Sequence, residues 1–298
     1  MIAQYRRHRD LCSMIVPVLA FFLIFCYGPM VGLMLAFKEY SLSRGMFHSP
    51  WVGFANFTRL FGSPDFPLAV RNTVVISALR LVFGFFAPII LALLLNECRV
   101  TWFRRGIQTL TYLPYFFSWV VLGGIFLMIL GGDGPLNSLI QSLGHSPISF
   151  LSNPVWFIVV LIVTGVWQGL GYAAVIYLAA LAGIDGNLYE AASLDGASRW
   201  NLVRSITMPS LSPTVVVLLI LSLGNVLNAG FDQIYNMYNP VVYSVSDIVD
   251  TYVLRRMIDM DFGLATAAGL FKSVVSLLLV VAANSIARRA THGEQGVW

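Results

Sequence analysis

The sequence has few charged residues for its length. Only 11% of its 298 residues are Asp, Glu, Lys or Arg, whereas a soluble domain carries about a quarter. Apolar residues make up 58% of the chain, and its mean hydropathy is +0.78. This composition excludes an ordinary soluble domain and indicates a polytopic membrane protein. About six apolar runs of roughly 20 residues each would account for it.

Lysine is especially rare in the sequence, and the nucleotide-binding motif that requires a lysine is missing. The chain has two lysines, Lys38 and Lys272, and neither follows a glycine. A phosphate-cradling loop of the G-x-x-x-x-G-K-[ST] type is therefore absent, and we expect neither enzymatic activity nor a bound nucleotide or other cofactor. The three cysteines and four histidines are scattered, without disulfide or metal-ligand spacing. The net charge of +4 is modest and comes mostly from arginines expected on the cytoplasmic side. It therefore reports how the chain is oriented in the membrane and does not indicate a nucleic-acid partner.

Six long apolar runs are spread along the chain. We predict membrane spans at about 14–37, 72–95, 107–130, 155–181, 211–230 and 263–287. The first run follows an arginine-rich amino terminus, but it is too long for a signal peptide and has no convincing cleavage site. No internal repeat is visible. The prediction is one all-α membrane domain over residues 1–298, with six transmembrane helices.

The arginines predict the orientation of these spans. With both termini inside, ten of the eighteen positive residues fall in cytoplasmic segments and six lie outside or at the outer border. The other two, Arg80 and Lys272, lie inside spans. Because positive residues accumulate in cytoplasmic loops, we expect cytoplasmic termini and a cytoplasmic segment at 182–210.

A polar stretch between the fourth and fifth runs, residues 190–213, reads EAASLDGASRWNLVRSITMPSLSP. Residues 189–194 favour a helix, and Gly196 would end it because glycine lacks the Cβ constraint. A helix of two turns is not stable alone in water, so the membrane domain or a partner must hold it. Pro209 is expected where the next membrane helix starts, since proline is tolerated in a first turn.

Small and acidic residues give this short helix the features of a docking element. Ala191 and Ala192 form an edge narrow enough to enter a cleft, and Glu190 and Asp195 offer acceptors to a partner's arginines. The alternative is an ordinary amphipathic linker that lies at the membrane interface.

Polar and aromatic residues inside the predicted spans suggest a substrate path. In and after span five, Asn225, Asn228 and Asp232 have the i, i+3, i+7 spacing of one helix face. Aromatic and amide side chains recur in spans three and four: Tyr112, Tyr115, Trp119, Trp167, Gln168 and Tyr172. Sugar rings stack on aromatic faces, and their hydroxyls need directional donors and acceptors. The alternative is that these groups hold helices together, as intramembrane polar groups often do.

The two charges inside spans each need a partner or a function. For Lys272 we favour a structural salt bridge with Asp232 or Asp261 over snorkelling or contact with an anionic substrate. Arg80 is expected to form a similar structural pair or to snorkel.

The polar stretch resembles the docking loop of ABC-importer permeases, whose pattern is EAA, a glycine, nine residues and then Ile-x-Leu-Pro. The matching positions are Glu190, Ala191, Ala192, Gly196, Ile206 and Pro209, with Met208 in place of the leucine. The segments WVGFANF, YLPYFFSWV, GFDQIYNMYNP and DTYVLRR are similar to the branch that imports complex oligosaccharides and polysaccharides.

The resemblance implies a maltose-permease-like fold in the inner membrane and import of a saccharide by alternating access. It also implies a second homologous permease, two cytoplasmic ATPases that bind the ATP and Mg²⁺, and an extracytoplasmic solute-binding protein. The alginate importer belongs to this branch, and Lys272 would suit an acidic sugar. Two alternatives are a self-contained secondary sugar transporter, which would show paired half-repeats, and a non-transporting scaffold, which would not need polar groups in span five.

Overall fold

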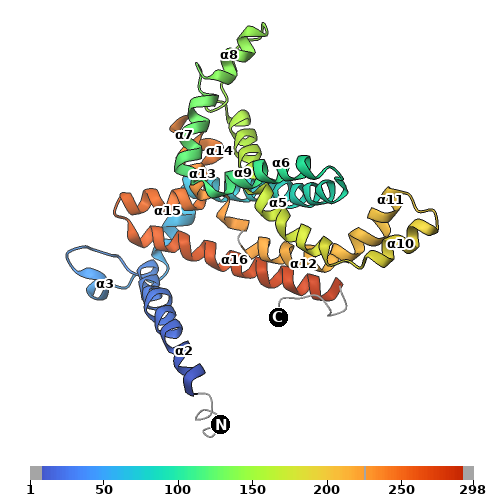
Figure 1. Ribbon diagram of the computed structural model, residues 1–298. Helices are drawn as coiled ribbons and strands as arrows, with labels where there is room; N and C mark the ends of the chain where they lie inside the picture. Colours follow the sequence, from blue (N-terminus) through green and yellow to red (C-terminus); the bar gives the residue numbers. More distant parts are fainter. Residues whose placement is uncertain (1–8, 225, 291–298) are drawn as a thin grey trace. The chain divides into compact units, whose positions relative to one another are not determined.

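The computed structural model describes residues 9–224 and 226–290, which are helical almost throughout (Figure 1). In this part of the chain the only β-type pairing is an isolated bridge between Lys38 and Trp51. Six helical segments are long and apolar enough to cross a membrane: Ser13–Phe37, Asp65–Glu97, Trp119–Ser142, Pro154–Ala182, Arg199–Gly224 and Phe262–Ser285. The all-α class and the number of spans are as predicted, whereas the second span begins earlier and the third and fifth spans have different bounds.

The chain divides into two compact units. The first contains Met1–Phe66 and Tyr252–Phe271, and the second contains Pro67–Thr251 and Lys272–Trp298. Two helices run from one unit into the other, α15 (Val249–Ile258) and α16 (Phe262–Ala290). A third such helix, α5 (Asp65–Glu97), enters the second unit after its first two residues.

The first unit holds the first span and the segment that follows it. The span combines α2 (Arg9–Phe21), the π-helix η1 (Phe22–Tyr27) and the 3-10 helix η2 (Gly28–Phe37). The short helices α3 (Gly45–His48) and α4 (Ala55–Gly62) come next.

Buried polar contacts organise the end of this span. The buried Lys38 Nζ donates to the Met46 and Phe47 carbonyl oxygens at 3.0 and 2.8 Å and lies 4.9 Å from the Trp51 ring centroid. Asn56 Nδ2 donates to the Ala36 carbonyl at 3.0 Å, which ties α4 to η2. The unit is therefore stabilised by satisfied polar groups as well as by apolar packing.

The third span is where the prediction of a helix over 107–130 is wrong. The chain forms α6 (Thr101–Tyr112), one 3-10 turn η3 (Leu113–Phe116), and then α7 (Trp119–Leu130). Pro114 in η3 has no N–H to donate, and the Ser118 side chain accepts from Val121 N to cap α7. These two local signals divide the apolar run, and the candidate span continues into α8 (Pro135–Ser142).

The fifth span begins earlier and ends earlier than predicted. After α9 (Pro154–Ala182) and α10 (Gly186–Leu194), one helical path runs from α11 (Arg199–Leu202) through the π-helix η4 (Val203–Thr207) to α12 (Met208–Gly224). Ser198 caps its start by accepting from Asn201 N, so Pro209 lies inside the path rather than at its beginning. The wide turn of η4, where Met208 N donates to Val203 O, directly precedes the proline, which has no N–H of its own.

Beyond α12 the second unit continues in short elements: η5 (Val226–Asn228), α13 (Phe231–Met237), η6 (Pro240–Val242) and α14 (Tyr243–Ser246). Helix α13 packs against α7, where a Cβ on Gly123 would lie only 3.1 Å from Asn236 Cβ. The main apolar cluster includes Phe157, Leu161 and Ile234, all fully buried. This packing holds α7, α9 and α13 together.

One buried amide carries a testable contribution to stability. Asn137 on α8 is 0% exposed, and its Nδ2 donates to the Gly131 and Ile148 carbonyl oxygens, both at 3.0 Å. Its Oδ1 accepts from Ile148 N at 2.8 Å. We expect Asn137→Leu to lower the free energy of unfolding by about 1–3 kcal/mol, because it leaves buried backbone groups unpaired.

Thermal unfolding of the purified protein in detergent measures this loss. Gln141→Leu is the control, because Gln141 is an exposed side chain on the same helix. Equal melting temperatures for the two variants would contradict a role for the Asn137 amide.

Candidate functional site

Helix α10 has well-defined caps at both ends. Asp185 Oδ1 accepts from Asn187 N at 2.9 Å at its start. At its end, Gly196 N donates to Ser193 O and Ala197 N donates to Ala192 O, at 3.1 and 3.0 Å. With Gly196 at φ +78°, these bonds form a Schellman motif. The prediction that Gly196 ends a two-turn helix is confirmed.

A side-chain contact ties α10 to the start of the fifth span. The Tyr189 hydroxyl lies 3.0 Å from Thr207 Oγ1, and Thr207 is buried in η4. Figure 1 shows α10 and α11 next to each other beyond the ends of α9 and α12. The short helix is therefore held against its own chain, as its length requires.

Large apolar side chains of α10 and α11 are exposed. Leu194 is 90% exposed and Trp200 is 72% exposed. A hollow of about 480 Å³ is lined by Tyr189, Glu190, Ser193 and Leu194. Large apolar side chains left in the open mark interaction surfaces. Sequence reasoning missed Leu194 and Trp200, since an isolated leucine or tryptophan in a helix is ordinarily read as core.

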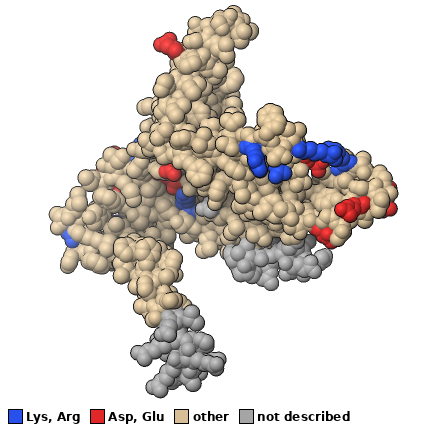
Figure 2. Space-filling model, viewed as in Figure 1, with Lys and Arg blue, Asp and Glu red and all other residues tan. Residues whose placement is uncertain are grey.

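The other predicted docking residues lie around this surface. Glu190, Ala191, Asp195 and Pro209 are exposed, while Ala192 and Ile206 are partly buried. On the face shown in Figure 2, acidic side chains gather at the α10 end of the second unit, and basic side chains gather near α6. The arrangement offers a partner an apolar contact with carboxylates beside it.

A second candidate site is a cavity of about 580 Å³ among α5, α9, α12 and residues 226–230. Most of its lining is apolar, and the polar side chains come from Ser77, Arg80, Tyr172, Ser222 and Asn228. No acidic residue is among the described residues that line it. The volume lies within the range of small-ligand sites, about 300–1,000 Å³.

The prediction that the polar residues of span five share one helix face is wrong. Backbone φ is +51° at Ala229 and +77° at Gly230, so the chain turns before α13 begins at Phe231. Asn228 lines the cavity, and its Oδ1 accepts from Phe231 N at 3.4 Å. Asp232 is exposed on α13 and does not line the cavity, whereas Asn225 lies outside the described residues.

The aromatic residues of span three do not share one face either, because η3 separates them. Tyr112 ends α6 and lies against Gly171 of α9, whereas Trp119 begins α7 and packs against the main apolar cluster. The Tyr115 ring instead stacks on Tyr172, with centroids 4.0 Å apart and planes 2° apart. Tyr172 also lines the cavity.

The remaining two candidates of span four lie earlier on α9. Trp167 meets the Phe126 ring edge at 5.8 Å between centroids, and Gln168 is partly buried. Neither residue lines the cavity. Of the two aromatic groups, the structure brings only Tyr115 and Tyr172 together in a ring contact beside it.

Lys272 forms a salt bridge, as the sequence favoured, but with a different partner. Its Nζ lies 2.6 Å from both carboxylate oxygens of Asp250. Asp261, one of the expected partners, pairs instead with Arg59 at 2.7 Å. The Asp250 carboxylate therefore compensates the positive charge of Lys272.

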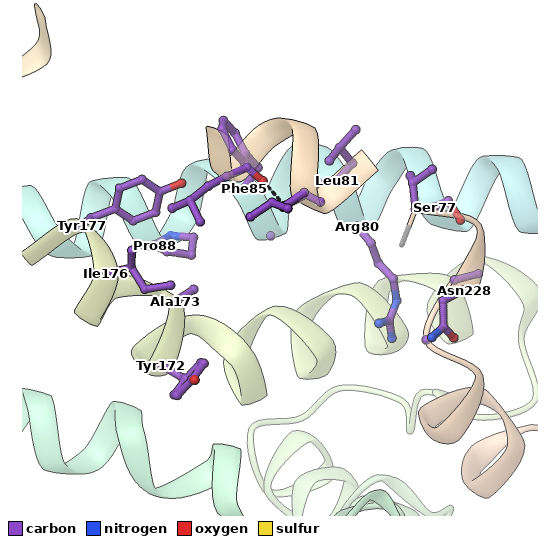
Figure 3. Close-up of a pocket in the computed structure, with 17 residues that line it drawn as sticks. Ser77, Arg80, Leu81, Phe85, Pro88, Tyr172, Ala173, Ile176, Tyr177 and Asn228 are labelled. Carbon is purple, nitrogen blue, oxygen red and sulfur yellow. Dashed lines mark hydrogen bonds between the residues drawn. The ribbon is translucent and has the colours of Figure 1, made fainter. Parts of the chain in front are cut away.

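Arg80 does not form the structural pair that was predicted. Within the part of the chain that the structure describes, its Nε and Nη2 are buried without a hydrogen-bond partner. In Figure 3 its side chain extends from α5 toward Asn228, and both residues line the cavity. A buried guanidinium beside two glycines was not foreseen, because Gly165 and Gly230 are distant from Arg80 in sequence.

Comparisons with known proteins agree with this geometry. Residues 84–292 match the family model described as binding-protein-dependent transport system inner membrane component. The chain is 44% identical to protein LplB of Bacillus subtilis, over 97% of this chain and 91% of that protein. It is 42% identical to the polygalacturonan/rhamnogalacturonan transport system permease protein YteP of Bacillus subtilis, over 98% and 91%.

A solved structure has the same fold over the full length. The bacterial alginate ABC transporter in complex with an alginate pentasaccharide-bound periplasmic protein contains a chain that is 38% identical, with a TM-score of 0.92. The match covers 100% of this chain and 99% of that one. Because the family model spans well over half of the sequence, including α10, this chain belongs to the inner membrane component family of binding-protein-dependent transport systems.

Proposed function

We propose that this chain is one permease subunit of an ATP-driven importer that carries an oligo- or polysaccharide across the inner membrane by alternating access. The observation that carries the proposal is the capped helix α10 with its exposed Leu194, in a six-span chain of this transport family. A secondary transporter would not need such a surface, and a scaffold would not need polar groups in span five.

The relatives suggest that the saccharide is acidic. One solved structure with 39% identity and a TM-score of 0.90 is described as importing the acidic polysaccharide alginate. The name of YteP refers to polygalacturonan, a polymer of a uronic acid. We infer that the substrate of this chain also carries carboxylates, and alginate is one candidate.

Energy for transport would come from separate subunits. The sequence has no phosphate-cradling loop, so we assign ATP and Mg²⁺ to two cytoplasmic ATPases that bind α10. A second, homologous permease would complete the membrane domain, and an extracytoplasmic binding protein would deliver the saccharide.

The geometry suggests how movement at α10 would reach the cavity. The Tyr189–Thr207 contact connects α10 to η4, and η4 continues into α12. After α12 come Asn228 and Gly230, which line the cavity. A displacement of α10 by an ATPase would thus be transmitted along one helix to the proposed substrate site, with flexible points at η4 and at the left-handed turn.

The first prediction of this model concerns the exposed leucine of α10. Leu194→Ser should weaken ATPase binding roughly tenfold, equivalent to about 1–2 kcal/mol, because the side chain would be buried only in the complex. Co-purification of the ATPase and substrate-stimulated hydrolysis measure the effect. Glu190→Ala should lower both as well, through loss of a charge-assisted contact.

Leu143→Ser is the matched control, since Leu143 is also exposed, at the end of α8. It should leave ATPase binding unchanged. Unchanged binding and hydrolysis in both the Leu194 and the Glu190 variants would leave α10 as a linker only.

A second prediction tests the end of α10. Gly196→Ala should cost about 1–2 kcal/mol, because a residue with a Cβ is strained at positive φ. No atom lies within 4 Å of the added Cβ, so the cost would be conformational rather than steric. We expect weaker ATPase coupling in reconstituted complexes.

Gly186→Ala provides the comparison, because Gly186 has equally open surroundings but no positive φ. It should retain coupling, and Gly196→Asn should retain more than Gly196→Val. If the two alanine variants couple equally well, the Schellman turn is not required.

A third prediction concerns orientation. Reporter fusions at residue 140 should be extracytoplasmic, and fusions near residue 198 should be cytoplasmic, as the arginine distribution indicates. The opposite pattern would place α10 on the wrong side of the membrane for an ATPase.

A further inference from the structure

The guanidinium of Arg80 occupies a slot made by two glycines from other elements. A Cβ on Gly230 would overlap the guanidinium, and a Cβ on Gly165 of α9 would lie 2.9 Å from Arg80 Nη2. Any other residue at Gly230 would require the guanidinium to move. The slot therefore fits a planar cation that projects from α5 to the edge of the cavity.

Nothing among the described residues neutralises this charge. Arg80 Nε and Nη2 are buried and unpartnered, and so are the oxygens Ser77 Oγ and Gln233 Oε1. The described lining of the cavity contains no carboxylate. An unpaired charge at membrane depth is costly and marks a functional group.

Other cations of the second unit show the contrast. Lys272 is paired with Asp250 at 2.6 Å. Arg71, nine residues before Arg80 on the same helix, donates from Nη2 to Ser244 O at 2.9 Å and to Asn72 Oδ1 at 3.0 Å. Both have structural partners within the unit, so they do not need a ligand, whereas Arg80 does.

The geometry points to a carboxylate as the missing partner. A guanidinium presents five donors in a planar fork, which matches the two oxygens of a carboxylate. One donor directed at Gln233 Oε1 would still leave the others unpaired. Figure 3 shows Asn228 beside the guanidinium, so its amide is placed to bind an adjoining hydroxyl. Tyr172 offers a ring in the same cavity on which a sugar face would stack.

We propose that Arg80 binds a carboxylate of the acidic saccharide inside the membrane cavity, with Asn228 as its neighbouring polar contact. This inference rests on the proposed import of an acidic saccharide. It assigns to Arg80 the role that the sequence analysis considered for Lys272. Within the cavity, Arg80 would then distinguish a uronate from a neutral sugar.

Binding to the purified complex of permeases and ATPases, without the solute-binding protein, tests the site directly. The probes are labelled trigalacturonate and the same trisaccharide with each carboxyl group reduced to a primary alcohol, and equilibrium dialysis measures both. Arg80→Met should bind trigalacturonate roughly 10- to 100-fold more weakly than the wild type, because a charged hydrogen-bonded contact is lost. Its affinity for the reduced trisaccharide should not change.

Two further variants separate ligand binding from a structural role. Asn228→Asp places a carboxylate of the protein beside Arg80, so it should weaken trigalacturonate binding while it maintains or raises the melting temperature. Arg71→Met removes a positive charge from the same helix and should leave the affinity ratio of the two probes unchanged. If the Arg80→Met permease does not assemble with its partners, the binding result for Asn228→Asp decides whether Arg80 contacts the ligand.

The outcomes distinguish this site from the proposed function. A wild-type complex that binds neither probe and transports no uronate overturns import of an acidic saccharide. A wild type that prefers trigalacturonate, with the same preference in Arg80→Met and Asn228→Asp, overturns only the assignment of Arg80. Equal losses for both probes in both variants would also overturn it, since the loss would then not depend on the carboxylate.

Discussion

The left-handed turn at Ala229 and Gly230 is the constraint on which the membrane site depends. It comes a few residues after the end of the fifth span and directs α13 back against α7. It also leaves space above Gly230 that only a residue without a Cβ provides, and the Arg80 guanidinium fills that space. Irregular backbone is tolerated at membrane depth only where protein buries it or where it lines a cavity, and this turn lines the cavity.

The fifth span connects the two candidate sites because it is a single helical path. One end meets α10 through the Tyr189–Thr207 contact, and the other end leads to Asn228 in the cavity. The irregular points of this stretch, the π-helix η4 and the left-handed turn at Ala229 and Gly230, lie toward its two ends. A stiff helix with adaptable ends is suited to transmit a displacement without melting, which agrees with the coupling proposed above.

The two cations inside spans illustrate opposite solutions to the same energetic problem. Lys272 is matched by Asp250, so a structural pair accounts for its charge. Arg80 has a shaped slot but no described counter-charge. A carboxylate ligand would supply during transport what the chain itself does not, and the saccharide would then be held most firmly where the membrane disfavours charge most.

The sequence by itself determined the features that depend on composition and local chemistry. Hydropathy predicted six spans, and the EAA segment with Gly196 predicted a short helix that ends at a glycine, because capping and glycine conformations are local. Pro114 and Ser118 carried the local signal for the break in span three, although the long apolar run concealed it.

Only the tertiary structure decided which distant residues meet. The sequence placed Asn225, Asn228 and Asp232 on one face because a continuous helix was assumed, and the turn at Ala229 and Gly230 separated Asn228 from Asp232. Asp250 as the partner of Lys272, and two glycines as the walls around Arg80, are contacts between segments far apart in the chain. Such contacts depend on how helices pack, and hydrophobic periodicity carries no information about that.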